Sequence, residues 1–131
     1  MDLTQQVDGY CERLSPDLWA EPLNAVTNLA FICVGVWMWW RSAGVPAARW
    51  LSVILLLIGL GSGVFHTYAT QWAGLADVLP ILGFILFYIY LMHRDVWRHG
   101  KMKSTAFAVG FIPFAAATTP VFTLIPGIGS S

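Results

Sequence analysis

The chain has 131 residues, of which 57% are hydrophobic and only 11% are charged, too few charges to cover a soluble domain of this size. Its formal net charge is zero and it contains no basic run, which argues against a nucleic-acid-binding protein. These numbers indicate one integral membrane domain over residues 1–131.

Four apolar stretches are long enough to cross the hydrocarbon core of a bilayer, which is roughly 30 Å thick and takes about 20 helical residues. These stretches are residues 22–40, 48–67, 72–92 and 105–125. Because lipid offers no partner to an unpaired backbone group, each stretch is expected to be a helix. The sequence therefore predicts an all-α membrane protein with four transmembrane helices.

The charged residues between the spans predict the orientation of the chain. Residues 1–21 are polar and acidic, unlike a secretory signal peptide. Most Lys and Arg residues lie in the first and third connections, so the positive-inside rule places these two connections in the cytoplasm and the N-terminus outside. The short loops favour a multi-pass protein of a bacterial inner membrane. Interfacial tryptophans agree with the limits of the spans, with Trp37, Trp39, Trp40 and Trp50 at the predicted inner boundary.

Three polar side chains interrupt the second and third spans. Ser62 and His66 are four residues apart, so they share one helical face, and Asp77 lies at the outer end of the next span. An ionisable group in a span is costly and often marks a functional site. The small residues Gly59, Gly61 and Gly63 permit close helix approach or leave room for a ligand. We therefore expect a polar centre near the outer leaflet.

A second polar group precedes and begins the first span. It comprises the carboxylates Asp8, Glu12, Asp17 and Glu21 and the amides of Asn24 and Asn28. Such an oxygen-rich set suits a hard cation such as calcium, although its spacing is not that of an EF-hand. A solvated acidic face and amides that bridge neighbouring helices are the structural alternatives.

In combination, these motifs resemble the alkaline ceramidase family. The resemblance rests on DGYCE at residues 8–12, AEPLNAVTN at 20–28, GLGSGVFH at 59–66 and DVLP at 77–80. That family belongs to a superfamily of seven-helix membrane hydrolases that also includes adiponectin-receptor-like proteins. The resemblance implies that this chain corresponds to the N-terminal portion of a seven-helix bundle.

The resemblance also implies chemical roles for individual residues. His66 matches the first of three histidines that hold a catalytic zinc ion, and Ser62 and Asp77 match the serine and aspartate of that site. Asp8, Glu12 and Glu21 match carboxylates of a calcium site. The implied reaction is hydrolysis of a ceramide-type lipid amide to a sphingoid base and a fatty acid.

Two departures from the family pattern bear on this interpretation. Leu14 replaces a calcium-binding asparagine, and Gly9 lengthens the spacing after Asp8 by one residue. The family's other two zinc histidines are four residues apart in its last helix. His93 and His99 are six residues apart and do not match this pair, so we interpret them as solvated loop residues. We therefore expect a truncated chain, inactive alone, whose site is completed by missing helices or another chain. The alternative is a noncatalytic membrane module, either a lipid-binding receptor-like protein or a scaffold.

Overall fold

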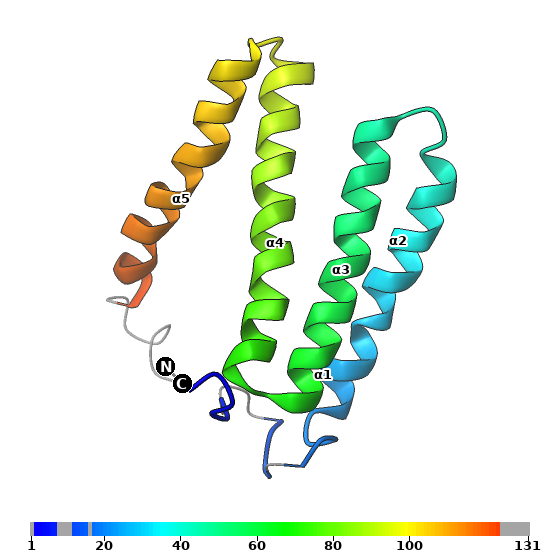
Figure 1. Cartoon of the computed structure of the whole chain (residues 1–131), viewed down its shortest axis with the longest axis vertical. Coiled ribbons are helices and arrows are strands. Elements are labelled where there is room, and N and C mark those ends of the chain that lie inside the picture. The colour runs from blue at the N-terminus through cyan, green and yellow to red at the C-terminus, as the bar shows by residue number, and fades with distance from the viewer. Residues whose placement is uncertain (1, 8–11, 16, 124–131) are drawn as a thin grey trace. The chain divides into compact units, whose positions relative to one another are not determined.

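The computed structural model describes residues 2–7, 12–15 and 17–123, which form helices joined by short connections (Figure 1). The elements are α1 (Pro22–Thr27), α2 (Leu29–Arg41), α3 (Pro46–Tyr68), α4 (Gln71–Leu91), a π-helical turn (Met92–Val96) and α5 (Lys101–Thr123). Among the described residues, the only β-type pairing is an isolated bridge between Gln6 and Thr70. The all-α prediction is confirmed.

Four helical stretches are long and apolar enough to cross a membrane, as the sequence predicted. They are Pro22–Arg41, Pro46–Tyr68, Gln71–Val96 and Lys101–Val121. The third stretch extends beyond its predicted end because the π-helical turn continues α4, and α5 begins before its predicted start. The third connection is therefore shorter than the charge pattern suggested, covering residues 97–100.

A helix break at Asn28 divides the first span. The Asn28 side chain donates a hydrogen bond from Nδ2 to the Asn24 carbonyl at 2.9 Å, and Thr27 Oγ1 donates to the same carbonyl at 2.9 Å. Such side-chain bonds compete with the regular helical ladder, and the Asn28 backbone N–H accordingly donates to Val26 instead. The break leaves α1 as a separate short helix before α2.

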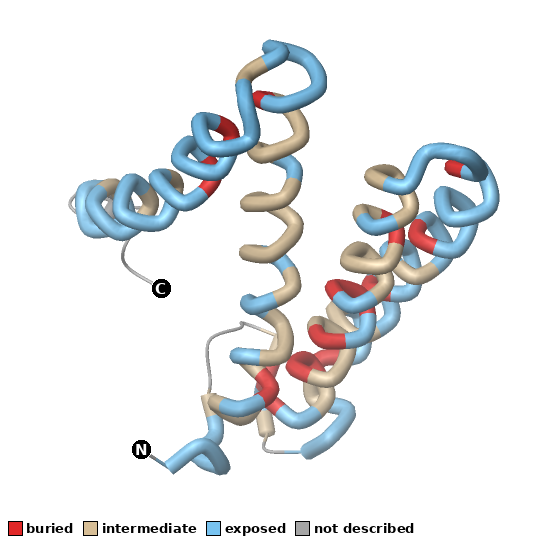
Figure 2. The backbone as a smooth tube through the Cα atoms, turned by 45° about the horizontal axis from the view of Figure 1, so that its top comes forward, coloured by how far each residue is buried: buried red, intermediate tan, exposed pale blue. Residues whose placement is uncertain are grey.

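The chain divides into two compact units, Met1–Phe84 and Ile85–Ser131. In the first unit, α2 packs beside α3, and buried residues occur along α3 from Ser52 to His66 (Figure 2). Close approach depends on glycine: a Cβ on Gly35 would lie 2.8 Å from the Leu56 side chain. A Cβ on Gly59 would lie 2.8 Å from Ile32. The expected role of small residues in helix approach therefore holds at Gly59.

The N-terminal segment binds to the turn between α3 and α4. Val7 N donates to Ala69 O at 2.7 Å, and Gln71 N donates to Gln5 O at 3.1 Å. Ala69, which ends α3, has a left-handed backbone with φ of 45°. These bonds place the segment before the first span at the same end of α3 as His66.

In the second unit, His93 does not fit the sequence interpretation of a solvated loop residue. Only 8% of His93 is exposed, because its ring stacks on Phe107 of α5 with a centroid distance of 3.9 Å. His93 Nδ1 and His99 Nδ1 are 3.0 Å apart, so the two imidazoles form a hydrogen bond. The helical continuation through the π-helical turn makes this packing possible.

Candidate active site

A buried carboxylate lies at the centre of the polar cluster in the first unit. Glu21 immediately precedes Pro22, the first residue of α1, and only 1% of Glu21 is exposed. Its Oε1 accepts from Arg13 Nε at 2.5 Å, and its Oε2 lies 2.5 Å from His66 Nδ1. Because Glu21 and His66 are 45 residues apart, this contact ties the start of α1 to the last turn of α3.

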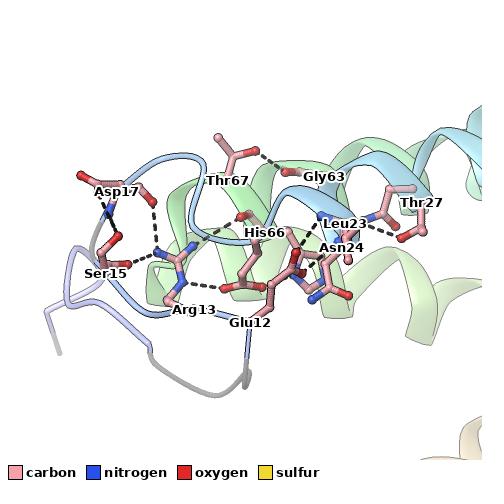
Figure 3. Close-up of polar contacts among 12 residues, drawn as sticks. Glu12, Arg13, Ser15, Asp17, Leu23, Asn24, Thr27, Gly63, His66 and Thr67 are labelled. Atoms are coloured by element: carbon pink, nitrogen blue, oxygen red, sulfur yellow. Dashed lines mark hydrogen bonds and ion pairs between the residues drawn. The ribbon is translucent and has the colours of Figure 1, made fainter.

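Arg13 provides the cation of this cluster. Its Nη2 donates to the His66 carbonyl at 3.3 Å, and its Nη1 donates to the carbonyls of Ser15 and Asp17 at 3.3 Å (Figure 3). The His66 carbonyl belongs to the last turn of α3, where carbonyls lack helical partners and a cation is favourable. Arg13 therefore compensates the Glu21 charge and caps α3.

The contact with Glu21 fixes the orientation of the His66 ring. His66 is 7% exposed, and in the neutral form its Nδ1–H donates to the carboxylate. This tautomer, inferred from the hydrogen-bond partner, leaves the lone pair on Nε2, on the opposite side of the ring. A histidine held in this way is typical of metal ligands, whose second ring nitrogen commonly binds a carboxylate.

The backbone of Asp77 lies close to α3. A Cβ on Gly61 would lie 2.1 Å from the Ala76 carbonyl oxygen and 3.4 Å from the Asp77 Cα, so α3 and α4 meet closely there. Asp77 Oδ1 is buried and has no hydrogen-bond partner among the described residues. Ser62, next to Gly61 in the chain, is half-buried. The structure thus places the predicted serine and aspartate on adjoining helices.

Glu12 has a structural partner in α1. Its Oε1 accepts from Leu23 N at 2.8 Å and its Oε2 accepts from Asn24 N at 3.2 Å, so the carboxylate caps the start of this helix (Figure 3). Asp8 lies outside the described residues. Calcium binding by Asp8, Glu12 and Glu21 stays a prediction, while hydrogen bonds engage the oxygens of the two described carboxylates.

With this geometry established, the comparison with known families is decisive: the sequence model of the Ceramidase family matches residues 6–127. The chain belongs to the Ceramidase family. Neither a curated protein nor a solved structure matches it significantly. Family membership supports a ceramidase-like function, namely hydrolysis of an amide bond in a membrane lipid. The four apolar helices of this ceramidase-family chain indicate an integral membrane protein.

The donor chemistry of this ceramidase-family protein fits part of a zinc site. His66 has the carboxylate partner expected of a zinc ligand, and Asp77 supplies a buried carboxylate oxygen that has no hydrogen-bond partner among the described residues. Within residues 2–7, 12–15 and 17–123, however, no three His, Cys, Asp or Glu side chains are grouped to hold a metal ion. The described residues therefore fit one zinc ligand, His66, supported by the Glu21 carboxylate. They do not form a complete zinc site.

Sequence reasoning missed Arg13, although the chain contains a signal for it. Arg13 is the only Lys or Arg among residues 1–21, and it stands among Glu12, Asp17 and Glu21 on the side of the membrane where cations are sparse. A lone cation among carboxylates indicates an ion pair. Its second role, as a donor to the His66 carbonyl, depends on a contact across 53 residues that no local pattern reveals.

Proposed function

We propose that this protein is a zinc-dependent lipid amidase that hydrolyses ceramide-type amides, with His66 as one zinc ligand. The observation that supports this proposal is the buried hydrogen bond between His66 Nδ1 and Glu21, in a chain of the Ceramidase family. Glu21 and Arg13 act as positioning residues, because they orient the imidazole without contacting substrate. The remaining zinc ligands come from outside the described residues, either from further helices or from another chain.

The proposed chemistry assigns a role to each polar side chain. Zinc, when bound, supplies a Lewis acid that polarises the amide carbonyl and lowers the pKa of water. Asp77 accepts a proton from the attacking water and transfers it to the leaving nitrogen. The water oxygen bonds to the carbonyl carbon and the C–N bond breaks, which yields a fatty acid and a sphingoid base. The Ser62 hydroxyl donates a hydrogen bond to the carbonyl oxygen as negative charge develops there.

The proposed orientation places this chemistry near the outer leaflet of a bacterial inner membrane. It rests on the positive charges of the first and third connections, which favour the cytoplasmic side and leave the N-terminus outside. A lipid amide enters from the bilayer between helices. A pocket of about 250 Å³ between α2 and α3, lined by Asn28, Gly63 and Thr67 among others, lies near the His66 end of α3, although Ser62, His66 and Asp77 are not among its lining residues.

The test is to express the whole reading frame, purify the protein with its native metal, and measure zinc content and fatty-acid release from ceramide. His66→Ala is expected to lose zinc and activity together. Asp77→Asn is expected to keep zinc and lose activity by at least about 100-fold, the usual contribution of a general acid or base. The matched control is His99→Ala, which changes a histidine in the other unit of the chain.

Unchanged zinc content in the His66 variant would refute the metal assignment. If the wild-type protein binds ceramide yet releases no fatty acid, the noncatalytic alternative of a lipid-binding receptor-like protein or a scaffold is correct instead.

A further inference from the structure

A second pocket lies at the other end of α3 from His66. It has a volume of about 380 Å³ and is lined by residues of α2, the first connection and the start of α3, including Trp39, Gly44, Val45, Arg49 and Trp50. Since α3 has 23 residues and rises about 1.5 Å per residue, its ends are roughly 30 Å apart. This pocket is therefore separate from the candidate active site.

Arg49 gives the pocket a positive charge without an acidic partner. Its Cζ lies 5.0 Å from the centre of the Trp39 ring, so the guanidinium rests on an aromatic face. Its Nε is buried and has no hydrogen-bond partner among the described residues. Arg49 also takes part in none of the ion pairs found among those residues. Because a buried donor without a partner is costly, a ligand that accepts hydrogen bonds would stabilise this arrangement.

The start of α3 adds the positive end of a helix dipole beside the same pocket, although Pro46 has no N–H and the N–H groups of Val45 and Arg49 already donate to Ser42 O and Val45 O. α3 begins at Pro46, its N-cap Val45 makes no side-chain capping bond, and its first turn has no acidic residue. The first backbone N–H groups of a helix lack internal partners and carry the positive end of the helix dipole, which favours an anion. Arg49 and the uncapped helix start therefore both favour a negatively charged ligand.

The surroundings of the pocket indicate that this anion comes from a lipid. Trp40 and Trp50 are 71% and 61% exposed, and indoles at the end of a membrane-spanning helix typically lie at headgroup level. Arg presents several donors in a planar fork that suits phosphate oxygens. The lining is otherwise apolar, with Val45, Pro46 and Val53 able to contact the glycerol and upper acyl chain.

We propose that this pocket binds the phosphate group of an anionic phospholipid, with Arg49 as the donor, the dipole of α3 as a further attraction and the two lining tryptophans as walls. The site lies far from His66 and takes no part in amide hydrolysis, so it is independent of the proposed function. It anchors the connection between α2 and α3 at the interface.

The test compares phosphatidylglycerol with phosphatidylcholine, both with brominated acyl chains, as quenchers of tryptophan fluorescence in phosphatidylcholine nanodiscs. The wild-type protein is expected to prefer phosphatidylglycerol. Arg49→Gln should weaken phosphatidylglycerol association about tenfold, which corresponds to about 1.4 kcal/mol. The matched control is Arg41→Gln, because Arg41 is exposed near the same connection and does not line the pocket. This control should change association less than about twofold.

Equal loss in the two arginine variants would overturn the proposal, because diffuse surface charge would then explain the preference. Competition by inorganic phosphate at millimolar concentration would overturn the lipid as occupant and indicate a soluble phosphate. Circular dichroism checks that each variant keeps its helices. If Arg49→Gln loses helical content, Arg49→Lys takes its place: it keeps the charge without the planar fork, so an unchanged lipid preference in that variant would also count against the site.

Discussion

Replacement of Arg13 by methionine tests the buried ion pair most directly. The side chains of Arg13 and Glu21 are 4% and 1% exposed, so loss of the guanidinium leaves a carboxylate away from water with His66 as its other described partner. Removal of one partner from a buried pair costs about 3–5 kcal/mol, because the remaining charge is uncompensated. We expect Arg13→Met to lower the free energy of unfolding by that amount.

A double-mutant cycle isolates the contribution of the pair. Glu21→Gln alone leaves Arg13 unpaired, whereas Arg13→Met with Glu21→Gln removes both charges and keeps an amide oxygen that can accept from His66 Nδ1. The double variant should therefore be more stable than the sum of the single losses predicts, by at least about 1 kcal/mol. Unfolding is measured by dodecyl-sulfate titration of the protein in mixed micelles, followed by circular dichroism.

The control for this experiment is an exposed ion pair in the same chain. Arg94 and Asp95 are 3.7 Å apart with side chains 47% and 57% exposed, so Asp95→Asn should cost less than about 0.5 kcal/mol. If Arg13→Met costs no more than this control, or if the single losses simply add, Arg13 and Glu21 do not form a buried, coupled pair and the reasoning fails.

Four further outcomes follow from the same contacts. Glu21→Gln should weaken zinc binding by about 10–100-fold, measured by competition with a chelating dye, because the variant loses the carboxylate that orients His66. Glu12→Ala should destabilise the protein by about 1 kcal/mol in the same titration through loss of the α1 cap, and no change would exclude that role. Gly61→Ala should cost about 1–3 kcal/mol because its Cβ meets the Ala76 carbonyl, whereas Gly63→Ala, with nothing within 4 Å, should be nearly neutral or stabilising. Removal of calcium with EGTA should leave the unfolding temperature unchanged if hydrogen bonds occupy the oxygens of Glu12 and Glu21; a drop that Glu12→Gln abolishes would establish the predicted calcium site instead.

The fold was predictable because it depends on the hydrophobicity of whole stretches of the chain and not on single residues. A stretch of about 20 apolar residues has few alternatives to a membrane-spanning helix, so local errors do not change the result. The ends of the spans were less predictable. Charged residues such as Lys101 begin α5 although they lie outside the apolar stretch, because a helix continues wherever its backbone bonds remain satisfied.

The residues of the candidate site were partly predictable, whereas their pairing was not. His66 and Asp77 are conspicuous because ionisable groups are rare within spans. The contact between Glu21 and His66 depends on how α1 packs against α3, which no spacing along the chain reveals. The same limitation explains His93, which adjacent basic residues suggested was solvated and which Phe107 covers.

The contacts of Arg13 imply that folding of the N-terminal segment and orientation of His66 are coupled. Arg13 binds both the carboxylate that holds His66 Nδ1 and the backbone carbonyl of His66 itself, so the segment and the last turn of α3 share their charge compensation. If the segment separated from α3, Glu21 would leave together with Arg13 and release the imidazole, because a Glu21 that stayed behind would be a buried carboxylate without its compensating cation. Substitutions in residues 12–21 should therefore change the properties of His66 without touching substrate. The segment before the first span is for this reason part of the candidate active site.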